Sequence, residues 1–369
     1  MGDFYLIDNN KKGYDNVVKQ LKSFLNTGEA ALIMSEENIS YFTGFHSSNG
    51  YLVVTTDKAY FLTDSRYIEA AENNITCCDE ILLLKSVQNE LSALIKGLDI
   101  NEIKLEGERI AVSRYNKLKE LFSSCSVTAS GDLDEAIDEI RKVKNDEQIS
   151  KIIKAQRIAE KAFEHILTFI STEKTEKEIA LELDYFMLKN GADGLSFETI
   201  AVSGKNSSMP HGVPSYKKIE NGDFITMDFG AVVDFYHSDM TRTVAVGEAS
   251  TKQIEVYDTV LEAQLKAIDA IKAGESCREI DKIARDIISS KAYGEFFGHG
   301  LGHGVGVEIH EGPSLNPSSS AVLKAGNIVT VEPGIYLPGQ FGVRIEDMGA
   351  VTENGFQNFT LSEKKLIVL

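Results

Sequence analysis

The chain has 369 residues, of which 43% are hydrophobic and 25% charged, an ordinary composition for a folded protein and a length that suits two domains. Its 56 acidic and 38 basic residues give a net charge of −18, which opposes binding to nucleic acid or to an anionic membrane surface. The longest apolar runs, such as Ile81–Leu84, are far shorter than the roughly 20 residues that a membrane-spanning helix needs.

The N-terminal sequence and the cysteines lead us to expect a cytoplasmic protein. Residues 1–5 contain no basic segment followed by an apolar stretch, so no secretory signal is predicted. The four cysteines are too few and too scattered to form a disulfide framework, which predicts reduced thiols. They are Cys77, Cys78, Cys125 and Cys277.

Short β-branched segments alternate with helical patterns over residues 30–129, which predicts an α/β domain. A hairpin turn is expected at Thr56-Asp57-Lys58, between two of the strands. We place the end of this domain near Gly131, giving domains of residues 1–131 and 132–369. The predicted strands are residues 30–34, 51–55, 59–63, 81–84 and 126–129, and the predicted helices include residues 65–73 and 87–95.

The second half repeats one order of elements. Helix, helix and strands are expected over residues 146–247, and the same order over residues 251–369. A duplicated α+β unit with a shared sheet is the simplest architecture for this pattern. Four helix starts carry a capping-box signature: Asn145 with Gln148, Thr175 with Glu178, Ser250 with Gln253, and Ser276 with Glu279.

Two aspartates stand in the first group of strands. One strand enters Asp228, and the next leaves through Asp239. If these residues are cross-strand partners, the midpoint of their hairpin falls between Val233 and Asp234, where a turn is plausible. The sequence therefore predicts two facing carboxylates in this hairpin.

Two glutamates repeat the arrangement downstream. Glu332 and Glu346 would be partners across a hairpin centred on Gly339, within the turn sequence Leu-Pro-Gly-Gln. Directly opposite residues have Cβ atoms roughly 4.5–5.5 Å apart, and like charges there destabilise a sheet. Four carboxylates held in apolar strands would be costly to bury unless cations neutralise them. A pair of divalent metal ions, which converts a bridging water to hydroxide near neutral pH, solves this charge problem.

Histidines gather in the same half of the chain. The glycine-rich run Gly298–Gly306 contains two of them on a backbone that allows close approach, and could supply one nitrogen ligand. Clustering alone is a weak signal, because an isolated histidine is more often a satisfied polar residue than a ligand. The five histidines are His211, His237, His299, His303 and His310, of which His237 is expected to be incidental.

Five motifs follow one another along the second half of the chain: Met227–Gly230, Ser238–Thr243, Gly302–Gly306 with His310-Glu311, Val331–Tyr336 and Val343–Asp347. In this order they resemble the motifs of the "pita-bread" metallopeptidases, and within them the proline-specific branch of aminopeptidase P and prolidase. The resemblance implies an α/β creatinase-like N-terminal domain and an α+β pita-bread catalytic domain with an internal pseudo-two-fold repeat.

The resemblance implies five metal ligands. Asp228 would be a terminal ligand of one metal, while Asp239 and Glu346 would bridge both. His303 and Glu332 would complete the shell of the other metal. Asp347 should point to the opposite face of its strand and is not expected to be a ligand.

The same resemblance implies roles in catalysis and substrate binding. Glu332 would take a proton from the attacking water, and His211 would hydrogen-bond the developing oxyanion. His310 would contact the substrate backbone near the scissile bond. Thr241 would contact a metal ligand or the water. Substrate-binding positions would be His299, Arg344 and Tyr336, although Arg344 could equally be a structural partner of a ligand carboxylate and Tyr336 a core aromatic residue.

The predicted function is that of an Xaa-Pro aminopeptidase that cleaves the first bond of peptides with a free N-terminus and a proline in second position. An Xaa-Pro dipeptidase is the alternative, and the preference for the aminopeptidase is slight. Four oxygen ligands and one nitrogen ligand favour Mn²⁺, with Co²⁺, Fe²⁺ and Zn²⁺ as alternatives. The resemblance also implies a homodimer. Methionine aminopeptidase, creatinase and an inactive binding module of the same fold are weaker readings.

Overall fold

The computed structural model describes residues 6–369, with side chains from residue 13, and the chain divides into two compact units between Arg141 and Lys142. All of helix α6 (Asp132–Lys142) except its last residue lies between the predicted domain boundary at Gly131 and this division. That helix belongs with the first unit because Arg141 donates a hydrogen bond to Asn38 Oδ1 at 2.8 Å, while Leu133 and Ile137 are buried.

The first unit is the predicted α/β domain. Its six-stranded sheet has the order β4-β3-β2-β1-β5-β6, with β1 antiparallel to β2 and parallel to β5. Buried apolar residues of the strands form its core. The strands are β1 (Glu29–Ile33), β2 (Gly50–Thr55), β3 (Ala59–Thr63), β4 (Glu80–Leu83), β5 (Glu102–Leu105) and β6 (Ser126–Thr128). The helices are α1 (Leu6–Phe24), α2 (Glu36–Thr43), α3 (Ile68–Asn74), the π-helix η1 (Val87–Leu91), α4 (Ser92–Gly97) and α5 (Val112–Leu121).

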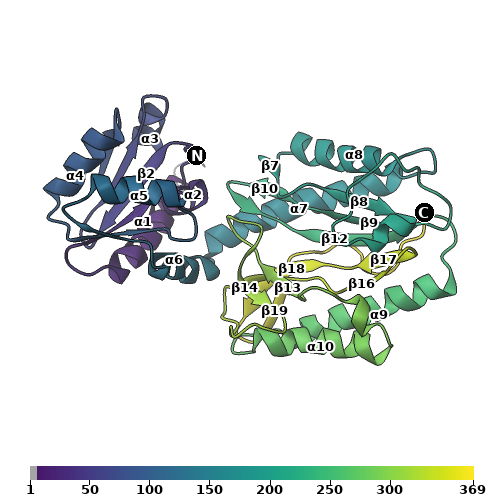
Figure 1. Ribbon diagram of the computed structural model, residues 1–369. Coiled ribbons are helices and arrows are strands. Elements are labelled where there is room, and N and C mark those ends of the chain that lie inside the picture. Colours follow the sequence, from purple (N-terminus) through teal and green to yellow (C-terminus); the bar gives the residue numbers. More distant parts are fainter. Residues whose placement is uncertain (1–5) are drawn as a thin grey trace. The chain divides into compact units, whose positions relative to one another are not determined.

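The second unit has the predicted repeated order of helix, helix and strands. Its strands lie between the α7–α8 pair and the α9–α10 pair (Figure 1). Each helix pair packs its apolar face on neighbouring strands, so the unit has two apolar clusters with the sheets between them. The first repeat contains α7 (Asp146–Phe169), α8 (Glu176–Lys189), β7 (Gly194–Leu195), β8 (Ile200–Ser203), the 3₁₀ turn η2 (Gly204–Ser208), β9 (Phe224–Phe229), β10 (Ala231–Val233), β11 (Tyr236–His237) and β12 (Met240–Ala245). The second contains α9 (Thr251–Ala270), α10 (Cys277–Ser290), the 3₁₀ turn η3 (Gly294–Phe296), β13 (Gly302–Gly304), β14 (Glu311–Leu315), β15 (Ile328–Val331), β16 (Gly334–Leu337), β17 (Phe341–Arg344), β18 (Asp347–Thr352) and β19 (Gly355–Asn358).

Three of the four predicted capping boxes are confirmed. The side chains of Asn145, Thr175 and Ser250 each accept a hydrogen bond from the backbone N–H three residues on. The side chain of that later residue in turn accepts a hydrogen bond from the backbone N–H of the capping residue. The fourth prediction is wrong, because the Ser276 side chain makes no capping hydrogen bond within the described residues. The backbone of Ser276 pairs instead with that of Val322 in an isolated β-bridge.

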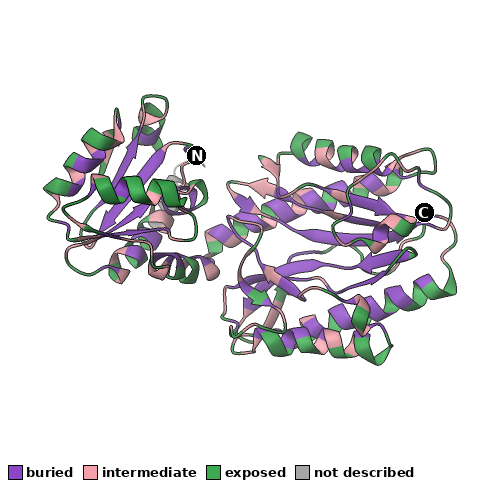
Figure 2. Cartoon of the chain, in the orientation of Figure 1, coloured by how far each residue is buried: buried purple, intermediate pink, exposed green. Residues whose placement is uncertain are grey.

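Burial follows the layers of each unit. The strands are mostly buried, whereas the helices expose one face to solvent (Figure 2). All four cysteines fall in the described part of the chain and are free thiols, as the sequence predicts. None of the helices from residue 6 onward is long and apolar enough to cross a lipid bilayer.

Candidate metal centre

The register of the first hairpin differs from the prediction. Asp228 of β9 faces Thr241 of β12, and not Asp239. The turn lies one residue later than predicted, at Asp234-Phe235, where both residues adopt left-handed backbone angles with φ of 49° and 72°. Two consecutive left-handed residues are typical of the tight turn whose twist suits a hairpin.

Asp228 and Asp239 still share a face of the hairpin. Ser238 donates its backbone N–H to Ala231 at 2.8 Å, so the register runs on past the strand ends and places Asp239 opposite Gly230. Gly230 lies two residues from Asp228, and side chains two residues apart on a strand point the same way. The two aspartates are therefore diagonal neighbours.

The register of the second hairpin is confirmed. Gly334 pairs with Arg344 in the β16–β17 hairpin, and Val331 pairs with Asp347 between β15 and β18. Both pairs have the same centre, Gly339, which adopts a left-handed φ of 71° in the turn. The register therefore sets position 332 opposite position 346, as the sequence predicts.

At this point the backbone amides of the two glutamates bond to segments outside their own hairpin. The Glu332 amide donates to the Leu301 carbonyl, just before β13, at 2.8 Å, and the Glu346 amide donates to the Thr241 carbonyl of β12 at 3.1 Å. Both glutamates are thereby fixed by segments outside their own hairpin. The second bond joins Glu346 directly to β12, which begins one residue after Asp239.

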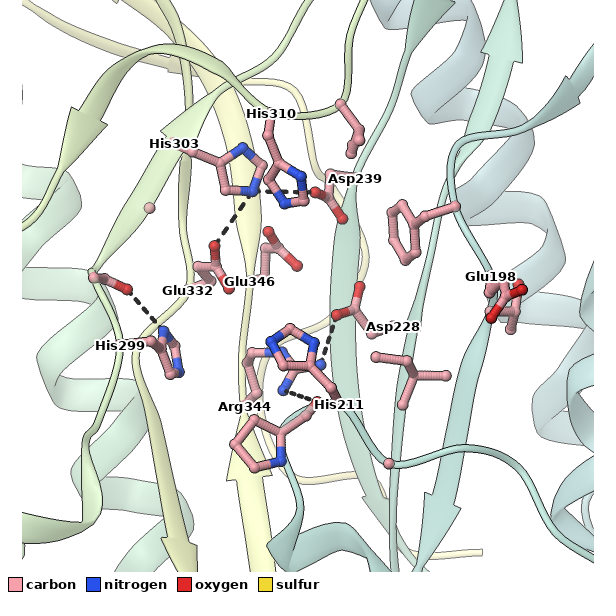
Figure 3. Close-up of a pocket in the computed structure, with 18 of the residues that line it drawn as sticks. Glu198, His211, Asp228, Asp239, His299, His303, His310, Glu332, Arg344 and Glu346 are labelled. Atoms are coloured by element: carbon pink, nitrogen blue, oxygen red, sulfur yellow. Dashed lines mark hydrogen bonds and ion pairs between the residues drawn. The ribbon is translucent and has the colours of Figure 1, made fainter.

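Asp239, His303 and Glu346 bring their ligand atoms within 4.8 Å of one another. His303 Nε2 lies 3.6 Å from an Asp239 oxygen and 3.4 Å from a Glu332 oxygen (Figure 3). His303 Nδ1 lies 3.0 Å from the Gly304 carbonyl, which can only accept, so Nδ1 carries the proton. Nε2 is then left with a lone pair that points at the carboxylates, as a metal ligand requires.

Burial changes the pKa of each of these groups in the direction that favours its neutral form. Desolvation, with repulsion from Asp228 and Glu332, raises the pKa of Asp239 well above its usual value. Desolvation, with repulsion from Asp239, likewise raises the pKa of Glu346. Burial raises the pKa of Glu332 to about 8 and lowers that of His303 to about 4. Without a compensating positive charge, the ionised carboxylates are therefore destabilised in this site.

Two orphaned atoms test whether divalent cations fit here. Asp228 Oδ1 and Asp239 Oδ1 are buried and lack a hydrogen-bond partner in the described structure. Asp228 Oδ2 is held by Arg344 at 2.6 Å, and Glu346 Oε2 accepts a hydrogen bond from Thr241 at 2.7 Å. A buried carboxylate oxygen without a partner is costly, and a divalent cation is the group that a set of oxygen and imidazole donors accommodates. The residues therefore fit a metal centre of two divalent ions.

The pKa shifts predict how metal removal changes stability with pH. Raised carboxyl pKa values mean that the metal-free folded protein binds protons more tightly than the unfolded chain. The stability that these three carboxyl groups contribute is therefore fully present near pH 4 and is lost as the pH rises toward 8. We expect the difference in Tm between protein in Mn²⁺ and protein in EDTA, measured by calorimetry, to be several degrees larger at pH 8 than at pH 5.5. In a domain of roughly 150–250 residues, a change of 1 kcal/mol in the free energy of unfolding moves Tm by roughly 2–4 °C. A difference that is constant or shrinks with pH would contradict the assignment.

A cavity of about 540 Å³ surrounds this cluster and contains the other predicted side chains. His303 and His310 lie at one end, with ring centres 4.4 Å apart, and His211 lies at the other end beside Arg344 (Figure 3). Burial lowers the pKa of His310, which favours its neutral form near pH 7. Sequence reasoning missed the apolar wall of the cavity, because Phe197, Ile200 and Ile309 carry no chemical signature.

Buried Arg344 and Tyr336 and half-buried His299 form a hydrogen-bonded chain at the cavity wall. Arg344 Nη1 donates to the Tyr336 hydroxyl at 2.9 Å, and that hydroxyl lies 3.0 Å from His299 Nε2. His299 Nδ1 lies 2.8 Å from the Gly300 carbonyl, so its Nε2 accepts the hydroxyl proton. Because Arg344 also holds Asp228, the structural role that the sequence left open for Arg344 is present here. A substrate-binding role for these three residues stays a prediction.

Asp347 and His237 lie apart from the cluster. Asp347 is fully buried in an ion-pair network with Arg242 Nη2 at 2.8 Å and Lys364 Nζ at 2.8 Å, which agrees with its predicted orientation away from the site. His237 is outside the residues that line the cavity, and burial lowers its pKa. Neither residue is placed to hold the cations.

Comparison with known proteins gives two family matches, "Metallopeptidase family M24" over residues 150–353 and "Creatinase/Prolidase N-terminal domain" over residues 26–143. An Xaa-Pro dipeptidase of Pyrococcus horikoshii is 38% identical over 354 residues, which are 95% of this chain and 98% of that protein. The solved structure of an Xaa-Pro dipeptidase from Bacillus anthracis is 42% identical, with a TM-score of 0.92 over 96% of this chain and 100% of its own. That of an X-Pro aminopeptidase from Thermotoga maritima is 37% identical, with a TM-score of 0.88 over 95% of this chain and 100% of its own.

Proposed function

This chain belongs to metallopeptidase family M24, and on that premise we propose that it is an Xaa-Pro dipeptidase. The observation that carries the proposal of a metal-dependent hydrolase is the convergence of buried carboxylates on His303 in one cavity. The dipeptidase type is supported by relatives of that name at 38% and 42% identity over nearly the whole chain. The slight preference of the sequence analysis for an aminopeptidase is thus replaced by its alternative.

Five side chains would hold the two cations: Asp228, Asp239, His303, Glu332 and Glu346. Bound there, the cations would lower the pKa of water toward neutrality and polarise the scissile carbonyl group. Mn²⁺ is our first choice, because four carboxylates and one imidazole form a predominantly hard donor set.

The chain's own residues would handle the proton and orient the substrate. The Glu332 carboxylate would accept a proton from the attacking water, a role that its position 3.4 Å from His303 Nε2 supports. His211 would donate a hydrogen bond to the oxygen that becomes negative as the carbonyl is attacked. His310 would hydrogen-bond the substrate backbone beside the scissile bond, and the apolar wall would exclude water around the proline ring.

Length selectivity tests the dipeptidase against the second candidate, an aminopeptidase, which the Thermotoga maritima relative favours. Purified protein in Mn²⁺ is assayed in parallel with Ala-Pro and with Ala-Pro-Ala. We expect kcat/KM for the dipeptide to exceed that for the tripeptide by at least about tenfold, since a site closed around two residues loses binding energy when a third must fit. A preference for the tripeptide would support the aminopeptidase, and no hydrolysis of either peptide would overturn both. Formation of a homodimer stays a prediction.

A further inference from the structure

The loop that carries His211 has little packing of its own. Val213 and Tyr216 on this loop are 76% and 79% exposed, so apolar burial does not fix its position. One tether is visible at the cavity, where Arg344 Nη1 donates to the Pro210 carbonyl at 3.3 Å. A catalytic hydrogen bond needs its donor placed to within a fraction of an ångström, so further restraints on this loop are to be expected.

Such restraints converge on a buried carboxylate outside the cavity. Glu176, the first residue of α8, has 0% exposure. Its Oε1 accepts from the backbone N–H of Ser203 at 2.7 Å and from that residue's hydroxyl at 3.0 Å. Its Oε2 accepts from the backbone N–H of Ser215 at 3.0 Å and from that hydroxyl at 2.6 Å. The Asn206 side-chain amide lies 3.1 Å and 3.2 Å from the two oxygens.

These partners flank His211 on both sides in the sequence. Ser203 and Asn206 precede it and Ser215 follows it, so a single carboxylate gathers the two ends of the loop. On the basis of the proposed function, we propose that Glu176 is a positioning residue for His211. It touches neither the cavity nor the candidate cations, and acts by holding the loop so that the imidazole reaches the developing oxyanion.

Replacing Glu176 with glutamine tests this proposal, because glutamine has almost the same shape as glutamate but carries a donor where glutamate has an acceptor. Every partner of Glu176 donates, and each of its oxygens faces one backbone N–H that cannot reverse its polarity. In Glu176→Gln, the side-chain NH₂ must therefore face either Ser203 N–H or Ser215 N–H, whichever way the amide turns. One end of the loop then loses its anchor, and a buried donor is left unsatisfied.

The same substitution two residues on is the matched control. Glu178 lies in the same first turn of α8, but its carboxylate is exposed, and among residues 13–369 it accepts hydrogen bonds only from Thr175, in the capping box. Glu178→Gln removes the same charge from the same helix terminus, and glutamine still serves a capping box. Any effect confined to Glu176→Gln is then not a consequence of helix charge.

The experiment measures Ala-Pro hydrolysis with Mn²⁺ and hydrogen exchange of the loop. We expect Glu176→Gln to lower kcat by about 10–100-fold with KM changed by less than about threefold, because His211 acts in the transition state. Amide exchange over residues 203–216 should become faster in Glu176→Gln and remain unchanged in Glu178→Gln. Ser215→Ala removes the hydroxyl that donates to Glu176 and accepts from the Lys217 N–H, and leaves the backbone bond from Ser215 to Glu176 in place. It should give a smaller loss of kcat of the same type and covers the case in which Glu176→Gln does not fold.

A double-mutant cycle with His211→Ala separates positioning from general damage. If Glu176 acts through His211, Glu176→Gln causes little further loss in the His211→Ala background. An equal fold-loss in both backgrounds, or a kcat of Glu176→Gln and of Ser215→Ala within twofold of wild type, would overturn the proposal. Inactivity of the wild-type protein toward both Xaa-Pro peptides would instead refute the proposed function, and the exchange measurement would still report whether Glu176 anchors the loop.

Discussion

Asparagine in place of Asp239 is expected to reduce kcat for Ala-Pro by at least about 10³-fold and to lower the bound Mn²⁺ from two ions per chain to one or fewer. Asp239 is buried among Asp228, His303 and Glu346, and one of its oxygens lacks a hydrogen-bond partner within residues 13–369. Asparagine has the same size but no charge, so a cation held there would lose an anionic ligand. Metal content by mass spectrometry and steady-state kinetics on the same preparation measure both effects.

Asp258→Asn is the control for this prediction. Asp258 is exposed on α9, and its replacement also removes one negative charge from the second unit. We expect wild-type kcat and two Mn²⁺ per chain for this control. If Asp239→Asn retains two tightly bound ions and more than a tenth of the wild-type kcat, Asp239 is not a shared ligand.

Glutamine in place of Glu332 is expected to lower kcat by about 10²–10⁴-fold, the range attributed to loss of a positioned acid or base. The Glu332 carboxyl has a pKa raised to about 8 by burial and lies 3.4 Å from His303 Nε2. Glutamine can neither take nor return a proton, so the loss should persist at every pH between 6 and 9. Kinetics across this range, with Mn²⁺ content measured alongside, distinguish a proton-transfer defect from simple loss of metal.

Glu353→Gln, in the exposed turn between β18 and β19, is the matched control for that substitution and should behave as wild type. The assignment would be wrong if Glu332→Gln kept kcat within tenfold of wild type with its metal content intact. If Glu332→Gln loses Mn²⁺ in proportion to its loss of activity, Glu332 acts only as a metal ligand and not as the proton acceptor.

The two hairpins show how far sequence reasoning could place the site. Leu-Pro-Gly-Gln has a strong turn signal, so the centre at Gly339 and the pairing of positions 332 and 346 could be predicted. The other turn, Asp234-Phe235, requires left-handed angles at an aromatic residue, which no propensity favours. The predicted centre was therefore one residue early, and each partner was misplaced by two positions. An even displacement keeps a side chain on the same face, so the candidate ligands were still correctly grouped.

Other parts of the molecule carried weaker signals. Strand β5 is not among the predicted strands, because its sequence Glu-Ile-Lys-Leu contains two charged residues and a single β-branched one. The boundary near Gly131 followed a change in sequence pattern, whereas the membership of α6 depends on contacts such as Arg141 with Asn38, which are far apart in sequence. The Glu176 anchor was likewise invisible, because its partners lie 27 to 39 positions away in the chain. Long-range contacts of this kind are not encoded in local periodicity.

The five candidate ligands are divided between the two repeats, with Asp228 and Asp239 in the first and His303, Glu332 and Glu346 in the second. A ribosome must therefore extend the chain at least as far as Glu346 before the centre can assemble. A nascent or truncated product that stops before β13 holds two aspartates and no imidazole from the glycine-rich run, too few donors for a binuclear centre. The duplicated architecture thus makes assembly of the candidate metal centre a late event in synthesis, because neither repeat supplies the whole donor set by itself.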